Sequence, residues 1–154
     1  MSASWQIERA AASDASTILD IQYQAYRQEA MLYGGVTLPP LLETADELKA
    51  VMKTHVVLKG LVDGVIAGSV RGREADGTCS IGRLVVAPDY QGRGLGSALL
   101  AAIEAAFAHI HRFELFTGHK SARNLGLYTR RGYTEFRRQR EDDAVTLVFL
   151  EKLS

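Results

Sequence analysis

The glycine-rich segment Gln91-Gly92-Arg93-Gly94-Leu95-Gly96 constrains the fold more than any other feature of this chain. Glycines at alternate positions allow a tight turn and let a ligand approach the main chain, so that several N–H groups point at one spot. A β-rich run ends at Val86, just before the segment. After the segment, apolar residues recur at helical spacing, at Leu95, Leu99, Ile103, Ala106 and Ile110. The sequence therefore predicts a strand, a turn and a long helix whose positive end favours a phosphate or pyrophosphate.

Other glycine-rich loops fit this segment less well, although a flexible turn without a ligand stays open. A dinucleotide-binding fingerprint needs a glycine three residues after Gly94, where Ser97 stands. A P-loop needs a lysine followed by serine or threonine directly after its last glycine, whereas Gly96 itself precedes Ser97. Both nucleotide-binding motifs are therefore disfavoured.

The rest of the chain alternates between strand and helix patterns. Thr44 and Glu47 form a capping box, Asp63-Gly64 is a strong hairpin signal, and Gly132 ends a helix. The apolar run Val145 to Leu150 indicates a strand covered on both faces. Strands are expected at residues 5–10, 55–62, 65–73, 78–86, 113–117, 135–139 and 145–151, and helices at 13–32, 44–54, 95–110 and 121–131. The order β-α-α-β-β-β-α-β-α-β-β predicts an α/β fold, with a mixed sheet flanked by helices.

Length and charge limit the class of protein. The 154 residues, 47% of them hydrophobic, fit a single domain over residues 1–154. Eighteen basic residues balance eighteen acidic ones, so no net field favours nucleic acid or an anionic membrane. The lone cysteine, Cys79, excludes an internal disulfide, and no Cys and His cluster has metal-ligand spacing. No leader or apolar span is evident, which predicts a cytoplasmic protein. No bound metal is expected, and a homodimer is compatible with the sequence.

The segment Val86-Ala87-Pro88-Asp89-Tyr90-Gln91-Gly92-Arg93-Gly94-Leu95-Gly96 resembles the core signature of the GCN5-related N-acetyltransferase (GNAT) superfamily. That signature is a strand ending in Val-x-Pro, then Gln or Arg, then G-x-G at the start of a helix. A second similarity is Tyr128, four residues before Gly132-Tyr133, and the predicted element order agrees with the family's fold over the whole chain. The resemblance implies an acetyl-coenzyme A-dependent N-acetyltransferase with a primary amine as acceptor and direct attack in a ternary complex.

The resemblance also implies which residues bind the cofactor. Backbone groups of Leu84, Val85 and Val86 would face the pantetheine arm and the acetyl carbonyl. The pyrophosphate would lie on the loop and the first helical turn, at Gln91, Gly92, Arg93, Gly94, Leu95, Gly96 and Ser97. Where family members commonly carry an Asn, seven residues before the tyrosine, this chain has Ser121, so that Ser121 or Asn124 would contact coenzyme A. Ser121 has an alternative role as a helix N-cap.

Tyr128 would be the general acid, or at least a hydrogen-bond donor, for the departing thiolate. A phenol suits this role because it stays protonated at neutral pH and can stand in an apolar site, although Tyr on an amphipathic helix also packs in cores. The strand positions where some relatives place a Glu or His base are Ser80 and Gly82 here, which cannot serve. His119 is the preferred candidate base and Glu29 the other.

The acceptor is expected to lie against the first two helices. Tyr23, Tyr26, Glu29, Tyr33 and residues 38–42 would form its wall, with ordinary core packing as the alternative. The basic group from Arg130 to Arg140 is interpreted as a solvated, partly paired face. Cys79 has no evident base partner, which disfavours a covalent route. A coenzyme A-binding sensor without catalysis stays open as the alternative function.

Overall fold

The computed structural model of the protein describes residues 5–154. Residues 1–4, which the single-domain prediction includes, lie outside the described residues. The strands are β1 (Trp5–Arg9), β2 (Val56–Val62), β3 (Val65–Ala75), β4 (Thr78–Val86), β5 (Arg112–Gly118), β6 (Thr134–Arg140) and β7 (Thr146–Leu153). The α-helices are α1 (Ala15–Ala30), α2 (Ala45–Val51), α3 (Leu95–Ala106) and α4 (Ala122–Arg130), with 3₁₀ turns η1 (Ala12–Asp14), η2 (Met31–Tyr33), η3 (Pro39–Leu41) and η4 (Pro88–Tyr90). The predicted order of strands and α-helices is confirmed.

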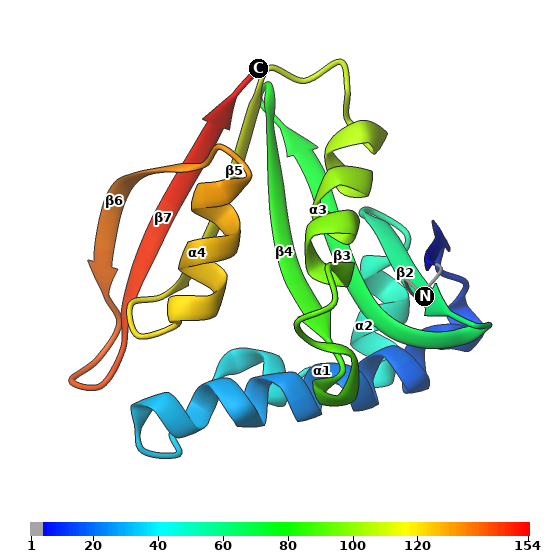
Figure 1. Ribbon diagram of the computed structural model, residues 1–154, viewed down its shortest axis with the longest axis horizontal. Coiled ribbons are helices and arrows are strands. Elements are labelled where there is room, and N and C mark those ends of the chain that lie inside the picture. Colours follow the sequence, from blue (N-terminus) through cyan, green and yellow to red (C-terminus); the bar gives the residue numbers. More distant parts are fainter. Residues whose placement is uncertain (1–4) are drawn as a thin grey trace.

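The strands of residues 5–154 form one mixed sheet in the order β1-β2-β3-β4-β5-β7-β6. All neighbours are antiparallel except β4 and β5, which are parallel and pair only from Thr78 to Ser80. Beyond Ser80 the two strands separate, so the sheet opens like a V toward α1 (Figure 1). One edge of β4 is thereby left without a strand partner in the middle of the sheet.

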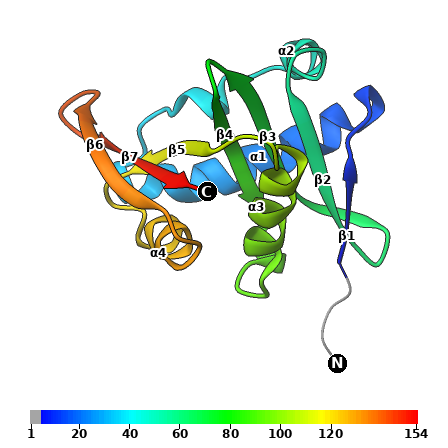
Figure 2. The same cartoon turned by 90° about the horizontal axis from the view of Figure 1, so that it is seen from above.

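Helices cover the two faces of the sheet unequally. Figure 2 shows α3 and α4 on one face and α1 and α2 on the other. On the α3 face, Leu99 and Ile103 are fully buried against β2, β3 and β4. The close packing of α3 requires glycine at position 68, because a Cβ there would lie 2.9 Å from Leu99 and 2.8 Å from the Val85 carbonyl oxygen. Ile18 and Leu48 anchor a smaller core beneath α1 and α2.

Local sequence signals predicted the hairpin turn and one helix cap correctly. Asp63 and Gly64 both have positive φ, 50° and 82°, as a tight hairpin turn requires. The Thr44 hydroxyl accepts from the Glu47 N–H while the Glu47 carboxylate accepts from the Thr44 N–H, which completes the capping box of α2. The first helix is shorter than predicted, because α1 ends at Ala30 and Leu32 falls in the 3₁₀ turn η2.

The prediction that β7 is covered on both faces is wrong. Val148 and Leu150 are buried toward α4, but Phe149 on the opposite face is only partly buried. Its neighbour on β5, Phe116, is 50% exposed, and the Arg137 guanidinium lies 3.8 Å from the centre of the Phe149 ring. An aromatic and arginine layer thus takes the place of a helix on this side of the strand.

Candidate functional site

The free edge of β4 coincides with a β-bulge. Ser69 of β3 pairs with Val85 and Arg71 pairs with Gly82, so the two residues between them on β4 oppose a single residue of β3. Arg83 has φ of 49°, the left-handed conformation that an extra residue in a bulged strand adopts. The bulge turns Leu84 toward α3 and α4 while Arg83 faces α1. Backbone groups of the Leu84 to Val86 segment on this edge are therefore available to a ligand that pairs like a strand.

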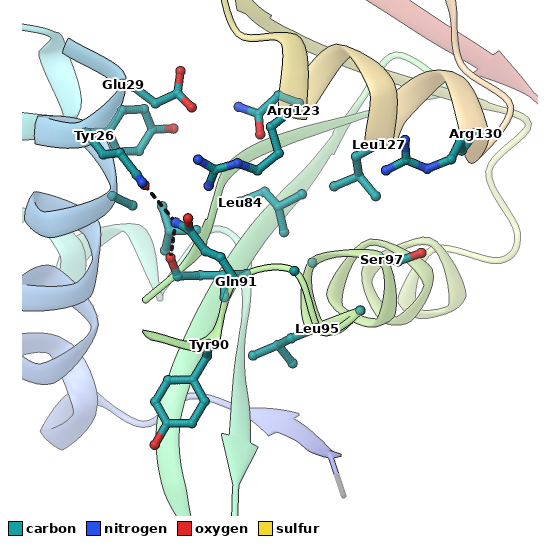
Figure 3. Close-up of a pocket in the computed structure, with 18 residues that line it drawn as sticks. Tyr26, Glu29, Leu84, Tyr90, Gln91, Leu95, Ser97, Arg123, Leu127 and Arg130 are labelled. Carbon is teal, nitrogen blue, oxygen red and sulfur yellow. Dashed lines mark hydrogen bonds between the residues drawn. The ribbon is translucent and has the colours of Figure 1, made fainter. Parts of the chain in front are cut away.

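The glycine-rich loop follows this strand directly. Gly92 and Gly94 have φ of 76° and 92°, so both positions need glycine for the tight turn that leads into α3. The Gln91 side chain donates to the Val86 carbonyl oxygen at 3.0 Å and to Gln28 Oε1 at 2.9 Å (Figure 3). Gln91 thus ties the loop to the end of β4 and to α1, which places the N-terminus of α3 beside the free strand edge.

These elements enclose an elongated cavity of about 280 Å³. It lies between the bulged strand, the loop, α1 and α4 (Figure 3). Of the residues predicted to bind cofactor or acceptor, those that line it are Leu84, Val85, Val86, Gln91, Gly92, Gly94, Leu95, Gly96, Ser97, Asn124, Tyr26 and Glu29. The remaining lining residues are Ala25, Gln28, Tyr90, Arg123, Leu127 and Arg130. The structure therefore brings residues from both ends of the chain to one site.

Two arginines on α4 line this cavity and were missed by the sequence analysis. Arg123, Leu127 and Arg130 lie about one turn apart, so they share one face of the helix. Figure 3 shows the Arg123 side chain pointing from α4 across the cavity toward α1. The helical spacing was the available signal, but Arg130 was assigned to the solvated basic group. Arg130 is exposed, as that assignment expects, but it also lines the cavity, whereas Arg138 and Arg140 pair with Glu135 and Asp143 on the surface.

Arg93 and Ser121 do not line the cavity. The Arg93 guanidinium turns back to donate to the Asp89 carbonyl oxygen at 3.0 Å and stacks over Tyr90. Ser121 is fully buried, and its hydroxyl donates to Glu29 Oε1 at 3.1 Å instead of capping α4. Ser121 thus holds the N-cap position of α4 without a capping bond from its side chain, which instead links α4 to α1.

His119 lies outside the cavity as well. Its Nδ1 accepts from the Thr146 N–H at 3.0 Å, and its ring packs against Tyr33 at a centroid distance of 5.7 Å. The Tyr33 hydroxyl accepts from the Lys120 N–H at 3.1 Å and rests against Gly118, where a Cβ would lie 1.9 Å from it. Tyr33 and the Glu29–Ser121 bond thus join the end of α1 to β5 and α4 across the mouth of the V. Of the two candidate bases, only Glu29 lines the cavity.

Tyr128 lies one residue beyond the cavity lining, in the core beneath it. It is 5% exposed and packs against Tyr133 at a centroid distance of 6.1 Å. Burial raises the pKa of Tyr128 far above its usual value, and Tyr26 and Glu29 add to the increase. Its hydroxyl therefore stays protonated and lies near the end of the cavity that Tyr26 and Glu29 line. Within residues 5–154 it donates no hydrogen bond to the protein.

A charged cluster lies on the opposite side of β4 from the glycine-rich loop. Glu43 is buried and accepts from Gln22 Nε2 at 2.9 Å and from Arg71 Nη1 at 2.9 and 3.1 Å. Arg83 Nε lies 3.6 Å from the same carboxylate, beyond hydrogen-bond distance. Burial favours the neutral acid, but the bonds from Gln22 and Arg71 and the charges of Arg71 and Arg83 outweigh it, so the pKa of Glu43 is lowered.

Among residues 5–154, neither the cysteine nor a cluster of metal-ligating side chains forms a second candidate site. Cys79 is fully buried under Gly72, and burial raises the pKa of its thiol to about 12. A thiol held in this state is not a nucleophile at neutral pH. In the part of the chain from residue 5 onward, no group of three or more His, Cys, Asp or Glu could hold a metal ion. Over the same residues, no helix has the length and apolar character needed to cross a bilayer.

Comparisons with known proteins agree with this geometry. The family model for the acetyltransferase (GNAT) family matches residues 18–133, more than half of the chain. The search of curated proteins gave no match. Among solved structures, the PaiA N-acetyltransferase from Thermoplasma acidophilum in complex with coenzyme A is 16% identical, with a TM-score of 0.80 over 98% of this chain and 99% of that one.

Two further structures have the same fold. YncA from Salmonella typhimurium, solved with acetyl-CoA, is 22% identical, with a TM-score of 0.75 over 97% of this chain and 93% of that one. The ribosomal-protein-S18-alanine N-acetyltransferase from Escherichia coli is 16% identical, with a TM-score of 0.80 over 97% and 94% of the two chains. At these identities the likeness concerns the fold.

Proposed function

The chain belongs to the acetyltransferase (GNAT) family, and we propose that it transfers the acetyl group of acetyl-coenzyme A to a primary amine in a ternary complex. The observation that carries this proposal is the cavity that runs from the glycine-rich loop along the free edge of β4 to Tyr26 and Glu29. It offers anion-binding groups at one end and polar side chains at the other. An extended thioester cofactor and an amine could meet between them.

The loop end of the cavity fits a pyrophosphate. The loop leads directly into the N-terminus of α3, where the first N–H groups of the helix and its dipole add positive potential. Arg123 and Arg130 add two guanidinium groups from α4. We assign the phosphates of the cofactor to these groups. Arg93 has a secondary role in this proposal, because its guanidinium holds the loop rather than the ligand.

The middle of the cavity fits the pantetheine arm. Leu84 to Val86 present a strand edge that β5 leaves free, so the amide groups of pantetheine can pair with it as an added strand would. Leu84, Leu95 and Leu127 supply apolar walls around this edge. An N–H of this segment can also donate to the oxyanion that forms when the amine attacks the thioester. No covalent intermediate on the protein is needed.

The far end of the cavity supplies proton transfer. Glu29 is placed to attract the substrate ammonium and to accept its proton, directly or through a water molecule. Tyr128 is placed to donate a hydrogen bond to the departing thiolate, because its hydroxyl has no competing partner among the described residues. His119 is not used in this scheme, since its ring is held by Thr146 and Tyr33 outside the cavity.

The test is acceptor-dependent release of thiol from acetyl-coenzyme A. Calorimetry first measures cofactor binding, and a panel of small amines, amino acids and peptides is then screened for thiol release above the rate without acceptor. We expect binding together with release for at least one amine class. Binding without release across the panel would replace the proposal with a coenzyme A-binding sensor that does not catalyse transfer.

A further inference from the structure

Arg83 lies on β4 next to the cavity lining and has no role in the reaction scheme. It is an arginine in a left-handed conformation on the bulge of β4, next to Leu84 of the cavity, and its side chain is 24% exposed. Its Nε atom is buried and has no hydrogen-bond partner within residues 5–154. A buried guanidinium donor without an acceptor is costly, so its presence beside a binding cavity points to a ligand that supplies the acceptor.

The acid nearest to Arg83 does not fill this role. The Glu43 carboxylate already accepts three hydrogen bonds, one from Gln22 and two from Arg71, and none of them comes from Arg83. Arg83 stays 3.6 Å away from that carboxylate. Two arginines thus face one carboxylate, and the cluster has one positive charge in excess. An anion is the group that this excess charge attracts.

The surface beside Arg83 is open to such a group. Gly82 precedes Arg83, and a Cβ built on Gly82 meets no heavy atom within 4 Å. Ser80, two residues before Gly82 on the same face of β4, is exposed. Because β5 departs from β4 after Ser80, this side of the strand edge is not closed by the sheet. Since the Arg83 side chain is also 24% exposed, a small molecule can contact it at this edge of β4.

Opposite charges flank Tyr26 at the end of the cavity that Tyr26 and Glu29 line. Glu29 lines the cavity on the same helix, one turn after Tyr26, and Arg83 lies on the strand side. The charges of Arg83 and Glu29 both act on the Tyr26 hydroxyl, in opposite directions, so both groups lie near it. This pair suits an ammonium on the Glu29 side and a carboxylate on the Arg83 side. It does not suit a polyamine, whose second cation would meet Arg83.

We propose that the acceptor is an amine that also carries a carboxylate, such as a free amino acid, and that Arg83 binds this carboxylate. The inference rests on the proposed acetyl transfer and names the substrate class of that same site. Arg83 is a specificity-determining residue in this scheme. Its planar guanidinium can form two parallel bonds to a carboxylate, which also fixes the direction of the amine.

The experiment compares amino acids with their own amides. Small, aliphatic, aromatic and polar amino acids are each paired with the corresponding amide, which keeps the amine and side chain and lacks the negative charge. The measured quantity is the ratio of kcat/KM for acid over amide. We expect the parent ratio to be at least about ten, and Arg83→Gln to lower it about tenfold to a hundredfold, as expected for loss of a charge-assisted bond. Comparing ratios between proteins cancels the difference in amine basicity.

Two variants serve as controls for charge and for folding. Arg83→Lys keeps the charge without the fork and should retain part of the preference. Arg73→Gln removes an exposed arginine from β3 outside the site and should leave the ratio at the parent value. Melting temperature and acetyl-coenzyme A affinity are measured for each variant, so that a folding defect in Arg83→Gln is recognised. If Arg83→Gln has such a defect, the acid-over-amide ratios of the parent and of Arg83→Lys test the inference instead.

The outcomes separate this inference from the proposed function. If amides are acetylated as well as acids when the rates are expressed per neutral amine, or if Arg83→Gln leaves the ratio unchanged, the inference is wrong while acetyl transfer stands. If no amine is acetylated, acetyl transfer fails, and calorimetry with the coenzyme A-loaded protein tests the inference alone. Amino acid binding that weakens in Arg83→Gln would then support the carboxylate site, and absence of binding would overturn it.

Discussion

The two sides of the bulge in β4 are built in different ways. The cofactor side combines main-chain groups of a contiguous segment, residues 84–97, with a short stripe on α4. The side proposed for the acceptor combines side chains from separate elements, the neutral amide of Gln22 from α1 and the charged groups of Glu43 before α2, Arg71 of β3 and Arg83 of β4. The first side suits a ligand common to a whole family, since main-chain groups tolerate side-chain change. The second side can vary residue by residue, which makes it the natural place for acceptor specificity.

The largest expected effect concerns the cofactor side. Gly94→Asp should lower acetyl-coenzyme A affinity by more than about a hundredfold, because it sets a carboxylate against the phosphates, and like charges brought together cost several kcal/mol. Gly94→Asn is the matched control, since asparagine has nearly the same size and brings the same backbone strain at the φ of 92° without the negative charge. Calorimetry on both folded variants measures the difference. Equal affinities for the two would show that the phosphates do not lie on this loop.

The next effect concerns the acceptor side and appears in stability. Glu43→Ala leaves Arg71 and Arg83 without their carboxylate in a largely buried place, and we expect the free energy of unfolding to fall by about 3 kcal/mol. Chemical denaturation measures this loss. Glu135→Ala, which breaks the exposed pair with Arg138, is the control and should have a much smaller effect. A loss no greater for Glu43→Ala than for the control would mean that the cluster does not support the fold.

Tyr128 lies between the two sides of the bulge, and its proposed role toward the thiolate can be tested separately from its packing. Tyr128→Phe removes only the hydroxyl, which has no protein partner among residues 5–154, so the melting temperature should stay near the parent value. If the hydroxyl assists the thiolate, single-turnover rates of acetyl transfer should fall about a hundredfold at unchanged cofactor affinity. Single-turnover conditions keep product release from masking the chemical step. Equal rates in the two proteins would return Tyr128 to a purely structural role.

The smallest effect is a dependence of stability on pH. The folded-state pKa of Glu43 lies below its unfolded value. The stability from its ionised form is therefore fully present above the unfolded pKa and is lost as the pH falls through the folded one. We expect the difference in unfolding free energy between the parent and Glu43→Gln to shrink as the pH falls from 7 toward about 4 and below. A constant difference over this range would contradict the assigned charge state.

Much of the fold could be predicted from local patterns. The capping box at Thr44 and the Asp63-Gly64 turn depend on neighbours within four residues, so their chemistry is visible in the sequence. The coverage of β7 was predicted incorrectly, because an apolar run does not reveal whether a helix or an arginine such as Arg137 lies over Phe149. The position of Ser121 indicated a cap, but the distant Glu29 takes its hydrogen bond.

The sequence by itself determined the strand, loop and helix of the cofactor side, because alternating glycines and helical spacing act through local backbone geometry. It placed Tyr128 and Asn124 on one helix for the same reason. Only the tertiary structure decided that Arg123 and Arg130 line the cavity and that Glu29 does so and His119 does not. It also decided that Arg83 lies beside Glu43 with an Nε atom that has no hydrogen-bond partner among residues 5–154. These facts depend on the separation of β4 from β5 and on the bulge at Arg83, which bring together residues up to a hundred positions apart. No local pattern encodes such long-range proximity, since it follows from how the sheet and helices pack.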